Sequence, residues 1–232
     1  MKTTQFDKFA EEYESLMLKS TSSSGERPEY FHEYKINDLK SYQNQTQINA
    51  NAILDLGAGV GNSIPYLKKY FPLAKIIAVD VSSKSINIAK ERFPGAAECL
   101  VFDGHKIPQA DNSIDIVIMC CVLHHIPHSE HSAIFSEVYR ILKPGQSIFI
   151  YEHNPLNPLT QKAVKDCPFD DDAVLIPAPQ MKERLASAGF KNVNCQFKVF
   201  FPKMFASIRS LEKYLIWLPL GAQYRATGIK PN

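Results

Sequence analysis

Residues 54 to 62 set the topology of the chain, and they read Leu54-Asp55-Leu56-Gly57-Ala58-Gly59-Val60-Gly61-Asn62. The apolar run before the glycines predicts a buried strand, and the apolar spacing after them predicts a helix to about residue 70. A glycine turn between a strand and a helix allows a tight reversal and a close approach of ligand to backbone. Its G-x-G-x-G spacing differs from the dinucleotide fingerprint, and no P-loop Gly-Lys-Ser/Thr follows.

Strand and helix patterns alternate on both sides of this turn. We expect further strands at about 75–80, 98–102, 114–120 and 147–151, separated by helical patterns. Such alternation implies a parallel sheet covered on both faces. Strands at about 193–201 and 222–229 would complete it with an antiparallel strand at one edge. The predicted fold is therefore α/β, a doubly wound, mostly parallel, seven-stranded Rossmann-like sheet.

Composition and charge exclude several classes of protein. The 26 basic and 24 acidic residues leave a formal net charge of +2, which gives no electrostatic reason to expect a nucleic-acid partner. No apolar stretch approaches the ~20 residues of a membrane span, and the first residues lack the apolar core of a secretion signal. Five cysteines without a C-x-x-C pair indicate reduced thiols and a cytoplasmic protein. The sequence carries no signal for an oligomeric state.

Acidic residues lie at the ends of three successive predicted strands. Asp55 ends the first strand, Asp80 ends the second, and Asp103, beside Gly104, follows the third. A carboxylate at the position of Asp80 can accept hydrogen bonds from both hydroxyls of a ribose. A carboxylate at Asp103 can accept a hydrogen bond from an adenine amino group. Each Asp alone is also explained as a turn or helix-cap residue. Together, around a glycine turn, they predict a nucleoside-type cofactor.

Six segments, taken in order, resemble the class I S-adenosylmethionine-dependent methyltransferases. They are Asp55–Gly61, Ala78–Asp80, Phe102–Gly104, Ser113–Val117, Val122–Ile126 and Glu137–Gly145, within about residues 50–153. The resemblance implies S-adenosylmethionine as the cofactor and in-line methyl transfer to a small organic acceptor. The first helical pattern also resembles the N-terminal lid of small-molecule members, and Tyr13 would close over the methionine end of the cofactor.

The resemblance implies roles for the residues of the glycine turn. Gly57 and Gly59, with Ala58 between them, would let the backbone meet the methionine moiety. Asp55 would fix that loop or bind the amino group of the cofactor.

The strand ends receive implied roles in the same way. Asp80 would take the ribose hydroxyls, and Val81 would pack against the adenine. Asp103 would bond the adenine amine, with the amide of Gly104 nearby. Cys121, at the end of the fourth strand, would line the methyl-transfer site.

A histidine cluster follows the fourth predicted strand. His124 or His125 could remove the proton of the acceptor, because histidine titrates near pH 6.5. Alternatively, one of the pair fixes the loop by bonding backbone. His128 and His131 have a metal-ligand spacing, but solvated helix-end residues explain them better, and we expect no metal there. The acidic run 166–172 could hold a divalent ion or attract a cationic acceptor; an exposed turn is the alternative.

We expect a single domain over residues 1–232. Its parts are N-terminal lid helices (1–48), a cofactor-binding core (50–153), an irregular, proline-rich acceptor-pocket insertion with C-terminal elements (154–220) and a last strand (221–232). Three rival functions stay open: an RNA or protein methyltransferase, a non-catalytic cofactor-binding protein, and an NAD-dependent oxidoreductase, for which the glycine spacing is wrong.

Overall fold

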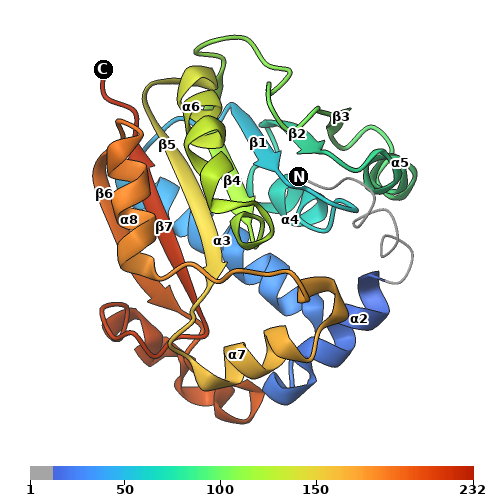
Figure 1. Ribbon diagram of the computed structural model, residues 1–232, viewed down its shortest axis with the longest axis vertical. Helices are drawn as coiled ribbons and strands as arrows, with labels where there is room; N and C mark the ends of the chain where they lie inside the picture. Colours follow the sequence, from blue (N-terminus) through green and yellow to red (C-terminus); the bar gives the residue numbers. More distant parts are fainter. Residues whose placement is uncertain (1–12) are drawn as a thin grey trace.

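One mixed sheet organises the protein, which is described here over residues 13–232 by a computed structural model (Figure 1). Within those residues, seven strands lie in the order β3-β2-β1-β4-β5-β7-β6. They are β1 (Ala52–Leu56), β2 (Lys75–Asp80), β3 (Glu98–Val101), β4 (Ile114–Cys120), β5 (Leu142–His153), β6 (Lys191–Lys198) and β7 (Gln223–Ile229). The strands β1 to β5 pair in parallel, and β7 runs antiparallel to both β5 and β6. The predicted α/β sheet is confirmed.

Helices cover both faces of this sheet (Figure 1). One face packs against α3 (Pro28–Thr46), α4 (Ile64–Tyr70) and α5 (Ser83–Arg92). The other face packs against α6 (His131–Ile141) and α8 (Ala178–Ser187). The strand order reverses between β1 and β4, and in open α/β sheets such a switch point forms a ligand crevice at the carboxyl ends of the strands. No helix within residues 13–232 has the length and apolar content that crossing a membrane requires.

The fifth strand begins earlier than the sequence pattern predicts. Lys143-Pro144-Gly145 does not separate α6 from a later strand but lies inside β5, which starts at Leu142. A register shift between Ile114 and Ile116 accommodates the extra residues as a bulge. The Nζ of Lys143 also lies 2.7 Å from Oδ1 of the buried Asp115, which holds this part of the strand against β4.

The proline-rich insertion is more regular than its sequence indicates. It contains α7 (Pro158–Lys165) and the 3₁₀ turn η4 (Pro168–Asp170). Pro158 opens α7, where a missing N–H is harmless, and the side chain of Asn157 caps the helix by accepting from Thr160 N at 3.0 Å. After β6, the chain forms a 3₁₀ segment, η5 (Lys203–Tyr214). Near the N-terminus, the serine-rich residues 20–24 form the end of α2 (Tyr13–Thr21) and the 3₁₀ turn η1 (Ser22–Ser24).

A partly buried carboxylate ties α3 to the sheet. Asp38 accepts from Lys198 Nζ and Arg225 Nη1, each at 2.8 Å, and from the hydroxyl of Tyr151 at 2.9 Å. Burial alone raises the pKa of Asp38, but Arg225 and Lys198 outweigh it, and the net shift is downward. The network therefore fixes the helix that forms one wall of the site described next.

Candidate active site

A cavity of about 250 Å³ lies at the carboxyl ends of β1, β2 and β4. One part of its lining is the glycine turn after β1 with the ends of the neighbouring strands. The other parts come from α2 and α3, from α7 and η4, and from the segments around residues 200 and 222. The predicted cofactor turn and the insertion therefore face one shared space.

The glycines of the turn have different roles. Gly57 and Gly59 both have positive φ, +80° and +53°. A Cβ on Gly57 would collide with both methyl groups of Val122, with Cγ1 at 2.7 Å, so this glycine is required by packing inside the protein. A Cβ on Gly59 would meet nothing within 4 Å, so Gly59 presents bare backbone to the cavity. Asp80 holds the turn by accepting from Gly59 N at 2.8 Å, and its other oxygen accepts from Ser82 N at 2.9 Å.

Asp55 carries a buried carboxylate with an unused acceptor. It lines the cavity, and its Oδ2 has no hydrogen-bond partner in the structure. Burial raises the pKa of Asp55 to about 7, although a hydrogen bond from Ser63 and the charge of Lys35 act in the opposite direction. An ammonium group in the cavity would satisfy this carboxylate.

Two basic residues of α3 face the same space, and the sequence analysis missed both. The buried Lys35 donates to Cys121 Sγ at 3.4 Å, and His32 lies one helical turn before it. Burial, with Lys35 next in importance, lowers the pKa of His32 to about 3. In the sequence, the only signal for these two residues is their i, i+3 spacing on a predicted helix. That spacing places them on one face of the helix but does not predict that this face lies at the carboxyl ends of the strands.

Of the remaining predicted cofactor residues, some line the cavity and others lie outside its lining. Ala58 lines the cavity, whereas Val81 and Gly104 lie outside its lining and beside each other; a Cβ on Gly104 would be 3.8 Å from Cγ1 of Val81. Asp103 is exposed, and its Oδ1 accepts from the backbone N of the two residues that follow Gly104, each at 2.8 Å. Tyr13 opens α2, but its side chain lies outside the described part of the chain.

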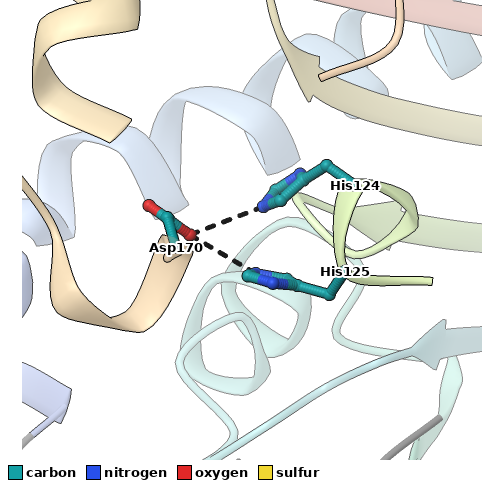
Figure 2. A group of neighbouring side chains, drawn as sticks. All are labelled: His124, His125 and Asp170. Atoms are coloured by element: carbon teal, nitrogen blue, oxygen red, sulfur yellow. Dashed lines mark ion pairs between the residues drawn. The ribbon is translucent and has the colours of Figure 1, made fainter. Parts of the chain in front are cut away.

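The two predicted catalytic histidines line the cavity from the turn after β4. Figure 2 shows both imidazole rings directed at Asp170 of the insertion. The Nε2 atoms of His124 and His125 are 3.6 and 3.4 Å from Asp170 Oδ1. On the opposite edges of the rings, His124 Nδ1 lies 2.5 Å from Glu152 Oε2, and His125 Nδ1 lies 3.4 Å from Asp172 Oδ1.

Glu152 positions the first of these histidines. It is buried at the end of β5, and its Oε1 accepts from the backbone N of Val122 and Leu123 at 3.0 and 2.8 Å. Burial disfavours a charge on His124, but Glu152 and then Asp170 outweigh burial and raise the pKa of His124 to about 10. A neighbouring pair of carboxylates therefore stabilises positive charge at this point of the cavity.

The role of fixing the loop by bonding backbone belongs to a third histidine. The buried His131 lies with its Nε2 3.1 Å from the carbonyl oxygen of Leu123 and 2.9 Å from that of Ile126. Its Nδ1 lies 2.6 Å from Nη1 of Arg184, so it accepts from that guanidinium. The sequence reading of His131 as a solvated residue is wrong, whereas His128 is exposed as expected.

Cys121 also lines the cavity. It follows β4 with a φ of +57° and lies close to Lys35, His153 and Gln223. Burial alone raises the pKa of the Cys121 thiol, but the charges of Lys35 and His153 bring it to about 7.

Comparisons with known proteins agree with this geometry. Residues 54–150 match the model of a methyltransferase domain family. A ubiquinone/menaquinone biosynthesis C-methyltransferase of Desulfotalea psychrophila is 34% identical over 97 residues, which are 41% of this chain and 39% of that protein. The chain therefore contains a methyltransferase domain.

Other methyltransferases are similar to this chain over more of their length. A demethylmenaquinone methyltransferase of Lactobacillus johnsonii is 28% identical, with 60% of this chain and 68% of that protein aligned. A methyltransferase structure from Thermotoga maritima, described as a possible histamine N-methyltransferase, superposes with a TM-score of 0.69 at 19% identity over 98% of both chains. The chain spans only about two fifths of the length of the Desulfotalea relative, so similarity to that protein covers the core of the class and not a whole enzyme.

Proposed function

We propose that this protein transfers a methyl group from S-adenosylmethionine to a small organic acceptor. The observation that carries the proposal is that one cavity joins two halves. Gly59 and the unsatisfied Asp55 Oδ2 form one half, and His124, His125 and Asp170 form the other. A transferase of this kind must hold donor and acceptor in one space, and the residues present fit that requirement.

The charges of the first half match an amino-acid end of the cofactor. The Asp55 carboxylate would accept from the ammonium group, and Lys35 would pair with the carboxylate, since both line the cavity. Asp80 would take the ribose hydroxyls with lone pairs that its two backbone contacts leave over, because each carboxylate oxygen can accept more than once. Val81 and Gly104 would border the adenine, and the lid would bring in Tyr13.

Asp103 needs a separate argument for its proposed contact with the adenine amine. One of its oxygens caps the turn that follows β3. The other oxygen is left to accept from the amine.

Catalysis by the chain consists of alignment and proton removal. When bound, the cofactor supplies a methyl group on a sulfonium, which leaves as a neutral thioether. Holding the acceptor in line can contribute ~7–11 kcal/mol. For an O–H or N–H acceptor, His125 would draw off the proton, an effect typically worth about 10²–10⁴-fold. Glu152 and Asp170 raise the pKa of His124 to about 10, so His124 already holds its proton at neutral pH and would supply positive charge beside the acceptor instead of acting as the base.

A small acceptor fits the cavity better than a polymer. The acceptor side is bordered by α2, α7 and η4, and its volume of about 250 Å³ is shared with the cofactor side. A structural neighbour from Haemonchus contortus, a phosphoethanolamine N-methyltransferase, was solved with phosphomonomethylethanolamine and S-adenosylhomocysteine (TM-score 0.57, 20% identity, 80% of this chain and 50% of that one). We infer a cytoplasmic location from the five cysteines, all of which are free thiols.

Calorimetry with S-adenosylmethionine, followed by transfer of a labelled methyl group to a panel of metabolites, tests the proposal. We expect one cofactor per chain and label in a small molecule. Binding without transfer to any acceptor would instead favour a non-catalytic cofactor-binding protein. Label in RNA or protein alone would overturn the choice of a small acceptor, and selective binding of NAD would overturn the cofactor site itself.

A further inference from the structure

Three side chains on the acceptor side of the cavity converge on one point. His124 Nε2 and His125 Nε2 lie 3.6 and 3.4 Å from Asp170 Oδ1, and the three atoms are all within 4.8 Å of one another. In Figure 2 the two rings, from the turn after β4, and the carboxylate, from the insertion, point toward each other. Both distances exceed the usual 2.7–3.2 Å of an N–H···O hydrogen bond. The spacing therefore leaves room for a small ion between the three groups.

The spacing matches one edge of a tetrahedral metal site. Zinc lies about 2.0–2.2 Å from imidazole nitrogen and carboxylate oxygen, so a tetrahedral angle places two ligand atoms about 3.3–3.5 Å apart. We propose that His124, His125 and Asp170 bind a divalent transition-metal ion of the Zn²⁺ type, with the remaining coordination position open to the cavity. Two imidazoles and one carboxylate form a ligand set typical of catalytic metal sites.

Both histidines are held by a second carboxylate, as metal-binding histidines usually are. Glu152 Oε2 is 2.5 Å from Nδ1 of His124, and Asp172 Oδ1 is 3.4 Å from Nδ1 of His125. The short contact with Glu152 places a proton on Nδ1 of His124 and directs its Nε2 at the shared space, and Asp172 puts a second negative charge on the Nδ1 side of His125. Once a metal displaces the Nε2 proton of His124, two neutral imidazoles and three surrounding carboxylates give the cluster a net negative charge, which favours a divalent cation.

The backbone keeps the insertion in register with the histidines. Val174 N donates to the carbonyl oxygen of His124 at 2.8 Å, and Ala173 N donates to that of Asp170 at 2.9 Å. The ring of Phe169 packs edge-on against His125, with centroids 5.1 Å apart. Asp170 therefore reaches the histidines through the folded insertion, although it is distant from them in the sequence.

The open position gives the site a role that rests on the proposed function. All three ligand residues line the cavity, so an acceptor bearing an oxygen donor would complete the coordination shell. A hydroxyl bound to a divalent cation loses its proton more readily, here to water, and becomes a better nucleophile. In the metal-loaded protein, His124 and His125 would thus assist the acceptor as ligands, and His125 would no longer act as the base.

Metal titration of the full chain tests the site without any need for turnover. The protein is stripped with a chelator and titrated with Zn²⁺ by calorimetry, and with Co²⁺ by visible absorption. We expect one ion per chain and a tetrahedral Co²⁺ spectrum without thiolate charge transfer. Asp170→Asn and His125→Gln should each weaken Zn²⁺ binding at least about 100-fold. The matched controls are Asp171→Asn, an exposed carboxylate next to the ligand, and Cys121→Ser, the nearby thiol; both should keep the affinity of the wild type.

The outcomes separate this inference from the proposed function. Absence of stoichiometric Zn²⁺ binding, with cofactor binding and methyl transfer intact after chelation, would overturn the metal site alone and leave a metal-free histidine base. A thiolate band in the Co²⁺ spectrum would overturn it even if the variants failed to fold. Failure to bind S-adenosylmethionine, with one Zn²⁺ still bound, would overturn the proposed function and leave the metal site standing.

Discussion

The ionisation of Asp55 should control how strongly the protein binds its cofactor. Burial raises the pKa of this carboxyl to about 7, and its Oδ2 is left without a partner in the cavity. The charged form is needed to accept from the ammonium group of the cofactor. Lowering the pH through 7 protonates Asp55, so we predict that affinity for S-adenosylmethionine falls as the pH falls.

The size of the effect follows from that pKa. With a pKa of about 7, about three quarters of the Asp55 side chains are ionised at pH 7.5 and about 3% at pH 5.5. Affinity should therefore fall about 25-fold between these two values, a loss of roughly 2 kcal/mol. The ligand-free fold should show the opposite trend. A carboxyl with a raised pKa favours folding at low pH, and that stabilisation is lost as the pH rises from about 4 to 7.

Calorimetry at several pH values, with circular dichroism to verify folding, measures the effect. Asp55→Asn is the matched variant, because it keeps the shape of the side chain and removes its titration. Its affinity should be weak and nearly independent of pH. Methylthioadenosine, which lacks the amino-acid end, should bind the wild type equally at both pH values. An equal pH dependence in wild type and Asp55→Asn would refute the reasoning.

Three further predictions concern packing, the buried network and the cofactor carboxylate. Gly57→Ala should lower stability by about 2–4 kcal/mol in urea unfolding, because its Cβ would collide with Val122, whereas Gly59→Ala should cost only about 1–2 kcal/mol but weaken cofactor binding. Asp38→Ala should cost about 3–5 kcal/mol in the same assay, since it removes the carboxylate from two buried cations. Lys35→Met should weaken cofactor binding by about 1.5–3 kcal/mol in calorimetry, and unchanged affinity would contradict its role.

The cofactor half of the cavity could be predicted from sequence because its signals are local. The glycine turn, Asp55 and Asp80 lie next to strand ends, and the carboxyl ends of parallel strands meet at one edge of the sheet. Each residue therefore needs only its own strand to be identified. Gly57 shows the limit of this argument, since its contact with Val122 joins two different strand ends and no local pattern reports it.

Lys35 and the acceptor half could not be predicted in the same way, because they come from distant segments. Lys35 comes from a helix near the N-terminus, and its direction depends on the network around Asp38. Asp170 comes from the insertion, whose prolines look like breaks in the sequence but open a helix and a 3₁₀ turn. Charged residues in loops carry no periodic signal, so only the folded chain shows that Asp170 and Asp172, of three consecutive aspartates, lie beside the histidines.

The way the cavity is divided has a consequence for specificity. Gly59 N in the glycine turn donates to the side-chain carboxylate of Asp80, so a change in either disturbs cofactor binding whichever acceptor is used. The insertion is anchored elsewhere, since Asn157 Nδ2 and Thr160 Oγ1 donate to the carbonyl oxygens of Leu220 and Ala222 at 2.7 and 2.9 Å. Neither acceptor belongs to the glycine turn. A chimera in which residues 155–173 are replaced by the corresponding segment of another methyltransferase should therefore change the choice of acceptor in the labelled-methyl assay. Its calorimetric affinity for S-adenosylmethionine should stay the same. A parallel loss of that affinity would contradict this division of the cavity.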